Sequence, residues 1–239
     1  MKIAIMCGGR GQRLGKLTDH VPKPLVKFNN RTILELIIEK YQQLGFYDFI
    51  FCIGYKGNMI REVVRNRISG INAEFVDAGK EAGILERLYN AKDLFEDKVL
   101  MAYGDTLADI ELNQFIEKHE NSDHEVTIVV APIQSPFGLV EYDQNNKVTY
   151  FKEKPVLKYY IGYAIINKSA FDLVSSKVIR MPDGDGLITF FQGLININKL
   201  GAFYHSGLQI TFNTQKDLKL AEEDLSNFYT VREKVNGNE

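Results

Sequence analysis

The sequence has no excess of charge of either sign and few of the residues from which disulfide frameworks and metal sites are built. Lys and Arg number 29 and Asp and Glu number 31, so the 239 residues carry a net charge of −2. This balance excludes the broad basic surface with which proteins bind nucleic acids or membranes. The two cysteines, Cys7 and Cys52, lie in separate apolar runs and form no CxxC pair, and the four histidines have no metal-ligand spacing. We therefore expect two buried thiols in a reducing compartment.

Long hydrophobic runs are also missing. The apolar run at 3–7 is too short for a signal peptide or a membrane span, and glycines follow it directly. We therefore expect a cytoplasmic protein whose partners are neither nucleic acid nor membrane. The sequence contains no internal repeat and no Pro/Gly-rich linker, and a chain of this length can bury an adequate core. The prediction is one domain over residues 1–234 with a frayed tail at 235–239.

Strands are expected where the first half has short runs rich in Ile, Val and Phe, because apolar runs without strict alternation are typical of strands covered on both faces. These runs are 2–7, 49–54, 73–76 and 98–103. Helical periods lie between and after them, at 33–44, 58–67, 84–94 and 111–120. The first follows a capping box formed by Thr32 and Glu35, and the last has Asp109 as its expected N-cap. This alternation predicts βαβ units and a parallel sheet.

The second half changes to strands that follow one another directly. Strands are expected at 125–131, 137–142, 147–151 and 161–166, and helices at 168–175, 187–197 and 214–228. We therefore predict an α/β fold, with a Rossmann-like, mostly parallel sheet flanked by helices and an antiparallel insertion around 130–165.

The strongest local signal is a glycine-rich loop directly after the first expected strand, CGGRGQRL at 7–14. Its glycines, Gly8, Gly9 and Gly11, let the backbone approach a ligand closely and present N–H donors to phosphate oxygens. Positive charge nearby comes from Arg10, Arg13, Lys16 and Lys23. Prolines on both sides of Lys23 restrict its position. A loop of this kind suits a triphosphate.

Two familiar glycine-rich loops fit less well. The dinucleotide fingerprint would need a third glycine where Leu14 stands, and its helix would begin inside the motif, which Pro22 and Pro24 prevent. The P-loop would need Gly-Lys-Ser/Thr, which is absent. A dinucleotide-dependent oxidoreductase is therefore a weaker hypothesis.

The stretch 8–14 followed by Pro22-Lys23-Pro24 resembles the signature of the sugar-1-phosphate nucleotidyltransferases. Tyr103-Gly104-Asp105 is similar to the metal-aspartate motif of that family, and 151–155, FKEKP, to its sugar-phosphate motif. Within the family, the glucose-1-phosphate cytidylyltransferases resemble this chain most. The stretches that carry this resemblance are 54–57, 76–79, 103–109 and 137–138.

The resemblance implies nucleotidyl transfer, in which a phosphate oxygen of an acceptor attacks the α-phosphorus of a nucleoside triphosphate and pyrophosphate leaves. No protein nucleophile is required, because the acceptor phosphate is already ionised; the enzyme aligns two polyanions and neutralises charge. By resemblance, the catalytic residues are Lys23, which bridges to the α-phosphate, and Arg13, which holds the β/γ end. Asp105 would hold the cofactor Mg²⁺, a cation that takes carboxylate and phosphate oxygens.

The same resemblance assigns the other site residues and the partners. The nucleotide-binding set is Gly8, Gly9, Arg10, Gly11, Arg13, Lys23, Gly79, Gly83 and Asp105, with Gly79 and Gly83 near the base. The acceptor-binding set is Glu153, Lys154, Gly162 and Tyr163. The metal-binding set is Asp105 and Asn213. The implied partners are CTP and a small phosphorylated acceptor, and the CDP-activated product would serve the synthesis of capsule or lipopolysaccharide. A homo-oligomer is also implied.

The sequence departs from the family pattern on the acceptor and metal side. Tyr160-Ile-Gly-Tyr163 stands where those cytidylyltransferases have an Asn-Gly-Gly segment, and Asn213 stands where they have a metal-binding Asp. The acceptor could therefore be a sugar 1-phosphate or a non-sugar phosphate such as phosphoglutamine or phosphocholine. Asn213 also keeps open a non-catalytic nucleotide-binding regulatory protein.

Overall fold

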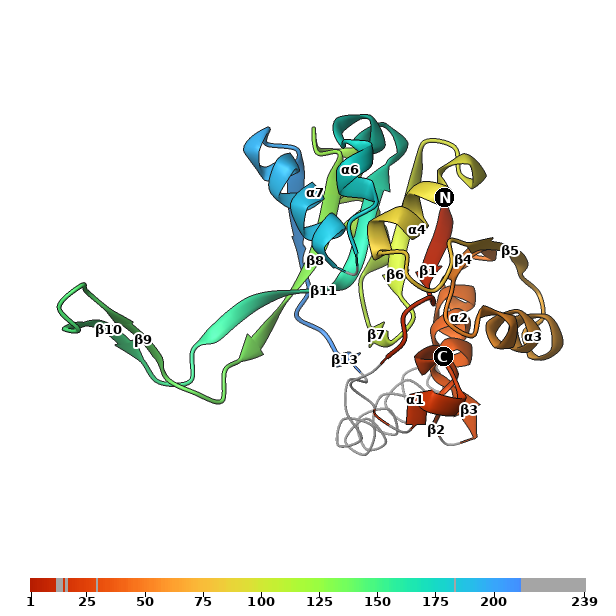
Figure 1. Ribbon diagram of the computed structural model, residues 1–239, viewed down its shortest axis with the longest axis horizontal. Coiled ribbons are helices and arrows are strands. Elements are labelled where there is room, and N and C mark those ends of the chain that lie inside the picture. The colour runs from red at the N-terminus through yellow and green to blue at the C-terminus, as the bar shows by residue number, and fades with distance from the viewer. Residues whose placement is uncertain (12–14, 16, 29, 183, 212–239) are drawn as a thin grey trace, which may run out of the picture.

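The computed structural model describes residues 1–11, 15, 17–28, 30–182 and 184–211. Within these residues, seven strands form a central sheet in the order β12-β8-β11-β6-β1-β4-β5 (Figure 1). They are β1 (Lys2–Met6), β4 (Asp48–Ile53), β5 (Asn72–Asp77), β6 (Lys98–Tyr103), β8 (Val126–Gln134), β11 (Val156–Asn167) and β12 (Leu200–Tyr204). Neighbouring strands are parallel except at β11, which is antiparallel to β6 and β8. The predicted α/β fold with a mostly parallel sheet is confirmed.

Helices cover both faces of this sheet. One face carries α2 (Ile33–Gln43), α3 (Gly57–Arg67) and α5 (Leu112–Glu120), and the other carries α4 (Ile84–Asn90), α6 (Ser176–Ile179) and α7 (Asp185–Asn196). Successive side chains of a strand point to opposite faces, so Ile3 and Ile5 enter one core and Ala4 the other. The helical turns outside these layers are α1 (Leu17–His20), η2 (Lys23–Leu25), η3 (Lys92–Leu94) and η4 (Lys168–Leu173).

None of the helices in the described part of the chain has the length and apolarity that a membrane crossing requires.

Several local predictions can be compared directly with the structure. The capping box of α2 is confirmed: the Glu35 N–H donates to Thr32 Oγ1 at 3.2 Å, and the Thr32 N–H donates to Glu35 Oε2 at 2.6 Å. The expected N-cap Asp109 is wrong, because α5 begins after Glu111 and Asp109 instead accepts a 2.5 Å bond from Lys40 Nζ. The expected helix at 214–228 and the tail at 235–239 lie outside the described residues.

The expectation that β5 is covered on both faces is also wrong. This strand is the edge of the sheet, and its side chains are half-buried or exposed. Its apolar residues are covered only in part, with Ala73 and Phe75 packed against one core and Val76 against the other. Phe75 stacks on Phe51, while Arg61 and Arg65 of α3 lie over the Phe75 ring.

The predicted antiparallel insertion forms an arm, defined here as residues 133–159. The outer ends of β8 and β11 stay paired as they leave the sheet, from Val156 opposite Gln134 to Tyr160 opposite Val130. Beyond them β9 (Leu139–Tyr142) and β10 (Val148–Lys152) form a separate hairpin, which extends far from the body in Figure 1. The other small sheets pair β2 (Lys27–Phe28) with β3 (Arg31–Thr32) and β7 (Thr106–Ala108) with β13 (Gln209–Thr211).

His119 of α5 is buried against the sheet as a neutral, fully bonded imidazole. Its Nδ1 lies 2.8 Å from Thr127 Oγ1, and its Nε2 lies 2.9 Å from Asn167 Oδ1. The Asn167 amide nitrogen donates to the His124 carbonyl, so Oδ1 is the acceptor and His119 Nε2 carries the proton. Burial lowers the pKa of His119 from its usual value, and this outweighs the bond to Asn167.

This histidine should make the free energy of unfolding depend on pH. In the unfolded chain His119 takes up a proton near pH 6.5, whereas in the folded chain it does so only at a lower pH. The stability contributed by neutral His119 is therefore fully present above about pH 6.5 and is lost as the pH falls through the lower folded pKa. Urea unfolding from about pH 7.5 down to about pH 5 should show this loss. In His119→Gln the dependence on pH should be shallower, whereas His20→Gln, at an exposed site, should match the wild type. Equal slopes in His119→Gln and the wild type would contradict the assignment.

Candidate active site

A cavity of about 880 Å³, called the central cavity below, opens at the carboxyl ends of β1 and β6. In open α/β sheets ligands bind at this end of the strands. The lining is formed mainly by the glycine loop 8–11, the turn at 23–24, the loop 80–84, the segment 103–106 and the strand residues 159–162. The structure therefore brings together five separate stretches, among them the glycine loop and the expected metal aspartate.

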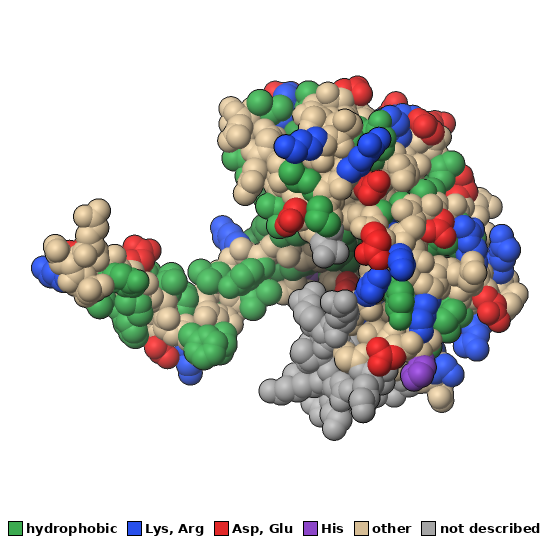
Figure 2. Space-filling model, viewed as in Figure 1, with side chains coloured by type: hydrophobic (Ala, Val, Ile, Leu, Met, Phe, Trp, Pro, Cys, Tyr) green, Lys and Arg blue, Asp and Glu red, His purple; other side chains and the backbone are tan. Residues whose placement is uncertain are grey.

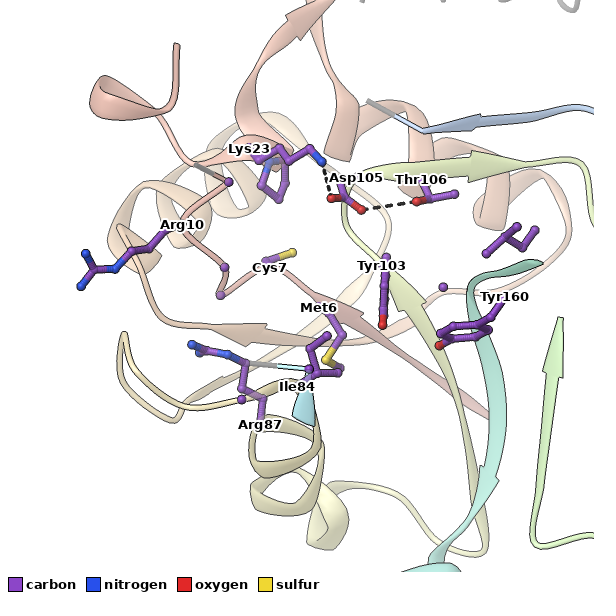
Figure 3. A pocket seen from close by; sticks show the side chains of 18 of the residues that line it. Met6, Cys7, Arg10, Lys23, Ile84, Arg87, Tyr103, Asp105, Thr106 and Tyr160 are labelled. Carbon is purple, nitrogen blue, oxygen red and sulfur yellow. Dashed lines mark hydrogen bonds and ion pairs between the residues drawn. The ribbon is translucent and has the colours of Figure 1, made fainter. Parts of the chain in front are cut away.

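Lys23 and Asp105 meet in the central cavity. Lys23 Nζ lies 2.6 Å from Asp105 Oδ2, and Thr106 Oγ1 lies 3.3 Å from the other carboxylate oxygen (Figure 3). The lysine side chain is 7% exposed and the carboxylate 25%, so the carboxylate is the more accessible partner. Pro22 N-caps the short η2 turn that carries Lys23, which fixes the start of this side chain.

Gly104 holds the aspartate against the glycine loop. Its N–H donates to the Met6 carbonyl at 3.1 Å. A Cβ at this position would lie 2.9 Å from the Met6 oxygen and 3.1 Å from Cys7 Sγ, so a larger residue does not fit. Burial, aided by Cys52 and Asp105, raises the pKa of the Cys7 thiol well above its usual value. The thiol therefore stays protonated, and Cys7 is a wall of the cavity and no nucleophile.

Arg87 is a cation beneath the glycine loop that sequence reasoning missed. It lies on α4, is only 3% exposed, and its Nη1 donates to the Ile53 carbonyl at 2.5 Å. A Cβ at Gly8 or Gly54 would lie 2.2 Å from the same Nη1, so the guanidinium fills the space between these two glycines. Desolvation lowers the pKa of Arg87, partly offset by Cys52 and Asp77. The only signal in the sequence is one arginine a helical turn after Gly83, directly after Glu86.

An exposed ion pair lies at the edge of the cavity beside the glycine loop. Arg10 Nη2 lies 2.7 Å from Glu81 Oε1, and both side chains are exposed. Gly83, the N-cap residue of α4, lines the cavity, as do Gly8, Gly9, Arg10 and Gly11. Gly79 is outside the described cavity lining; its φ of 84° is left-handed and its carbonyl faces Gly54.

Only one of the four residues expected to bind the acceptor is among the described residues that line the cavity. Gly162 lines the cavity; its φ is 86°, and a Cβ there would lie 2.6 Å from the Tyr103 ring. Tyr163 is buried behind it and donates from its hydroxyl to the Thr106 carbonyl at 2.6 Å. Glu153 and Lys154 are exposed at the base of the hairpin and are not among the described lining residues.

The wall on this side is aromatic. The rings of Tyr103 and Tyr160 meet edge to face at 5.9 Å, and Ile161 and Tyr159 extend the wall. Burial raises the pKa of Tyr103 to about 12 and that of Tyr160 well above its usual value. Both phenols therefore stay neutral, and the segment 159–162 brings no charge to the cavity.

Two expected site residues, Arg13 and Asn213, lie outside the described residues. Within those described, no group of three or more His, Cys, Asp and Glu side chains is placed to hold a metal ion. Asp105 nevertheless fits Mg²⁺, because its carboxylate is partly exposed in the cavity and this ion often takes only one or two carboxylates plus substrate phosphates.

The cavity thus combines backbone N–H groups, the cations Arg10, Lys23, Lys80 and Arg87, and a carboxylate that can take a cation. Such a site can bind and align polyanions, and it offers no activated thiol. Residues 2–181 match the family model described as nucleotidyl transferase.

The chain belongs to the nucleotidyl transferase family.

Curated relatives agree with this membership. The chain is 29% identical to the "Probable glucose-1-phosphate cytidylyltransferase" of Bacillus subtilis and 28% identical to the glucose-1-phosphate cytidylyltransferase of Salmonella typhi. Each match covers 91% of this chain and 93% of the relative. HddC of Yersinia pseudotuberculosis, solved in complex with GMP-PN, has the same fold: its TM-score is 0.71 at 21% identity, over 94% of this chain and 99% of that one. The prediction that the chain is a nucleotidyltransferase enzyme is thus confirmed.

Proposed function

We propose that this nucleotidyl transferase is a Mg²⁺-dependent cytidylyltransferase. A phosphate oxygen of a small phosphorylated acceptor attacks the α-phosphorus of CTP, the bond to the β-phosphate breaks, and pyrophosphate leaves. The product is a CDP-activated group, which we place in the cytoplasmic synthesis of capsule or lipopolysaccharide. The Lys23–Asp105 pair beside the glycine loop carries the proposal, because it sets a cation and a metal-binding carboxylate at one point of a phosphate-binding cavity.

The nucleotide would lie along the glycine loop. Backbone N–H groups of 8–11 and the side chain of Arg10 would hold the triphosphate, with Arg13 at its β/γ end. Arg87 would support the loop from below and present its remaining N–H groups to the nucleotide. Gly83 and Gly79 would lie nearest the base.

Lys23 would act on the α-phosphate. Its ammonium group already lies in the cavity with a carboxylate partner, so binding of the nucleotide would exchange that partner for phosphate oxygens. Asp105, with Asn213, would then hold Mg²⁺, which supplies positive charge to the triphosphate when bound. The barrier would be lowered by alignment and electrostatics alone.

The acceptor would lie against the aromatic wall. Gly162 leaves room beside Tyr103, and the charged groups Glu153 and Lys154 would reach the acceptor from the base of the arm. A sugar 1-phosphate is the first candidate, because the curated relatives named above are glucose-1-phosphate cytidylyltransferases. The uncharged wall at 159–162 also favours testing a small non-sugar phosphate, such as phosphocholine or phosphoglutamine.

The test is release of pyrophosphate from CTP, UTP, dTTP, ATP and GTP, each paired with glucose 1-phosphate, other sugar phosphates, phosphocholine and phosphoglutamine. We expect turnover with CTP and one acceptor class, lost when EDTA replaces Mg²⁺. Turnover with another triphosphate only would reject the cytidylyl assignment. Tight CTP binding without turnover on any acceptor, in Mg²⁺ or Mn²⁺, would favour the regulatory alternative.

A further inference from the structure

Tyr163 lies just inside the point where the exposed outer part of β11 becomes buried. Figure 2 shows hydrophobic side chains along the arm, and the exposed ones on the outer part of β11 include Val156 and Tyr159. From Ile161 inward the strand is buried, and Tyr163 is only 3% exposed. Tyr163 is also not among the described residues that line the central cavity. Its place therefore does not suit the contact with an acceptor that the family resemblance implied.

An irregularity in β11 directs this side chain. The register of β11 against β8 shifts between Tyr160 and Ala164, and Gly162 in that stretch has a φ of 86°. A β-bulge of this kind re-aims a side chain, and bulges are common beside active sites. Here the Tyr163 ring enters the core that α2 covers, beside Tyr41.

The hydroxyl of Tyr163 takes the place of a neighbouring strand beside β7. It donates to the carbonyl of the buried Thr106 at 2.6 Å. Just after β7, the Asp109 N–H donates to the Leu208 carbonyl on the edge that faces β13. Backbone groups of alternate residues point to opposite edges of a strand, so the Thr106 carbonyl points to the other edge. Among the described strands none pairs with β7 there, and Tyr163 supplies the donor.

This bond holds one end of the turn that carries Asp105. The turn joins β6 to β7, and at its β6 end the Gly104 N–H donates to the Met6 carbonyl at 3.1 Å. At its β7 end Tyr163 holds the Thr106 carbonyl, and the Thr106 hydroxyl lies 3.3 Å from Asp105 Oδ1. The direction of the Asp105 carboxylate therefore depends on contacts at both ends of the turn.

We propose that Tyr163 is a positioning residue for the Asp105 carboxylate. Its hydroxyl fixes the peptide that follows Asp105, and thereby the direction in which the carboxylate is presented to Mg²⁺ in the central cavity. This role rests on the proposed function, in which Asp105 holds that ion. Removal of a group behind a metal ligand commonly costs about 10- to 100-fold in metal affinity. Tyr163 acts through one peptide group, so we expect an effect near the lower limit, roughly tenfold.

Tyr41 of α2 offers a matched control. Its ring belongs to the same core as that of Tyr163 and lines the same small cavity between α2 and β7. The two side chains are almost equally buried. The Tyr41 hydroxyl, however, has no hydrogen-bond partner in the part of the chain that the structure describes. Tyr41→Phe therefore removes the same atom from the same region without breaking a described bond.

Thermal unfolding tests the hydrogen bond itself. Tyr163→Phe leaves the buried Thr106 carbonyl without this donor, so its Tm should fall by roughly 2–10 °C. Tyr41→Phe should stay within about 2 °C of the wild type, because its hydroxyl has no bond to lose. Equal Tm values for the two variants would overturn the proposal, because the Tyr163 hydroxyl would then hold nothing.

Titration calorimetry with CTP tests the effect on metal binding without any turnover, at a temperature where all three proteins are folded. With EDTA, the wild type and both variants should bind CTP with the same Kd within about twofold, because neither tyrosine lines the described cavity. With Mg²⁺, Tyr163→Phe should bind CTP roughly tenfold more weakly than the other two, since the ion takes both phosphate and carboxylate oxygens. A loss that is equal with EDTA and with Mg²⁺, or no loss at all, would overturn the proposal.

Pyrophosphate release with the best substrate pair distinguishes this role from contact with the acceptor. For Tyr163→Phe, the Mg²⁺ concentration that gives the half-maximal rate should rise roughly tenfold, while the KM for the acceptor stays within about twofold. A higher acceptor KM with an unchanged Mg²⁺ requirement would return Tyr163 to the acceptor site and overturn the proposal.

Failure of the proposed function would look different. A wild type whose affinity for CTP does not respond to Mg²⁺ would refute the metal-dependent function, and the role of Tyr163 with it. A wild type that responds to Mg²⁺, together with a Tyr163→Phe variant that responds equally, would refute the role of Tyr163 alone.

Discussion

Replacing Lys23 by methionine is expected to lower kcat for nucleotidyl transfer by roughly 10³-fold or more, with a smaller change in KM for the nucleotide. Removing one preorganised charge-stabilising donor commonly costs about 10²–10³ in kcat, and an ammonium group acting on a developing phosphate charge belongs at or above the upper end. Methionine keeps the apolar stem of the lysine in its buried position, so the loss isolates the charge. Steady-state pyrophosphate release with the best substrate pair measures it.

The chain offers a matched control in Lys40. Both lysines are buried, and each contacts a partly exposed aspartate, at 2.6 Å for Lys23 with Asp105 and 2.5 Å for Lys40 with Asp109. Breaking a buried pair costs up to about 3–5 kcal/mol, and less where the carboxylate can be hydrated, as both can be here. Lys40→Met should therefore lose about as much stability as Lys23→Met. Its kcat should stay within about threefold of the wild type, because Lys40 is not among the described residues that line the central cavity.

The two variants separate a role in transfer from a role in folding. Thermal unfolding of both sets the temperature at which each is fully folded, and kcat is compared there. If Lys23→Met kept a turnover like that of Lys40→Met, Lys23 would serve only to hold Asp105 in place, and the proposed contact with the α-phosphate would have to be abandoned.

The sheet could be predicted from the sequence because its information is local. Short apolar runs placed β1, β4, β5 and β6 within one or two residues, and a side-chain pattern of four residues placed the start of α2. The predictions that failed concern features set by residues that are distant in the sequence. The run of β5 looks like a fully covered strand, yet it ends the sheet, and strand order is not encoded in the run itself. Asp109 has the residue type of an N-cap, but a lysine 69 residues earlier in the chain takes its carboxylate.

The site likewise contains residues that a local motif reveals and residues that only the fold brings together. The glycine loop is a continuous motif, and its described residues do lie together with Lys23 and Asp105 around one cavity. Arg87 could not be found this way, since its importance comes from two glycines, at 8 and 54, that leave space for it. Tyr163 shows the opposite case: it follows Gly162 in sequence, but alternation along β11 turns its side chain into the core. Spacing identifies a motif, whereas only the fold determines which of its side chains reach the ligand.

The glycine loop and the buried arginine beneath it lead to a second large effect. Gly8→Ala is expected to raise the dissociation constant for the nucleotide by roughly 10- to 100-fold. The new methyl group would occupy the position of the Arg87 guanidinium, 2.2 Å from Nη1, and the arginine cannot withdraw toward Gly54 because the same atom already fills that space. Overpacking of this kind costs about 1–3 kcal/mol, which the free protein relieves by shifting the loop. The nucleotide must draw the loop N–H groups back into place, so this cost is paid on binding, where each 1.4 kcal/mol is about tenfold in affinity.

Gly9→Ala is the matched control, because a Cβ at Gly9 meets no atom within 4 Å and its φ is not in the left-handed region. Isothermal titration with CTP should place Gly9→Ala within about twofold of the wild type. The double variant Gly8→Ala/Arg87→Ala identifies the cause: if the clash is responsible, the double variant binds no more weakly than Arg87→Ala alone, which is a strongly non-additive result. Additive losses would instead mean that the methyl group obstructs the nucleotide directly, and that Gly8 is required for the approach of the ligand and not for the packing of Arg87.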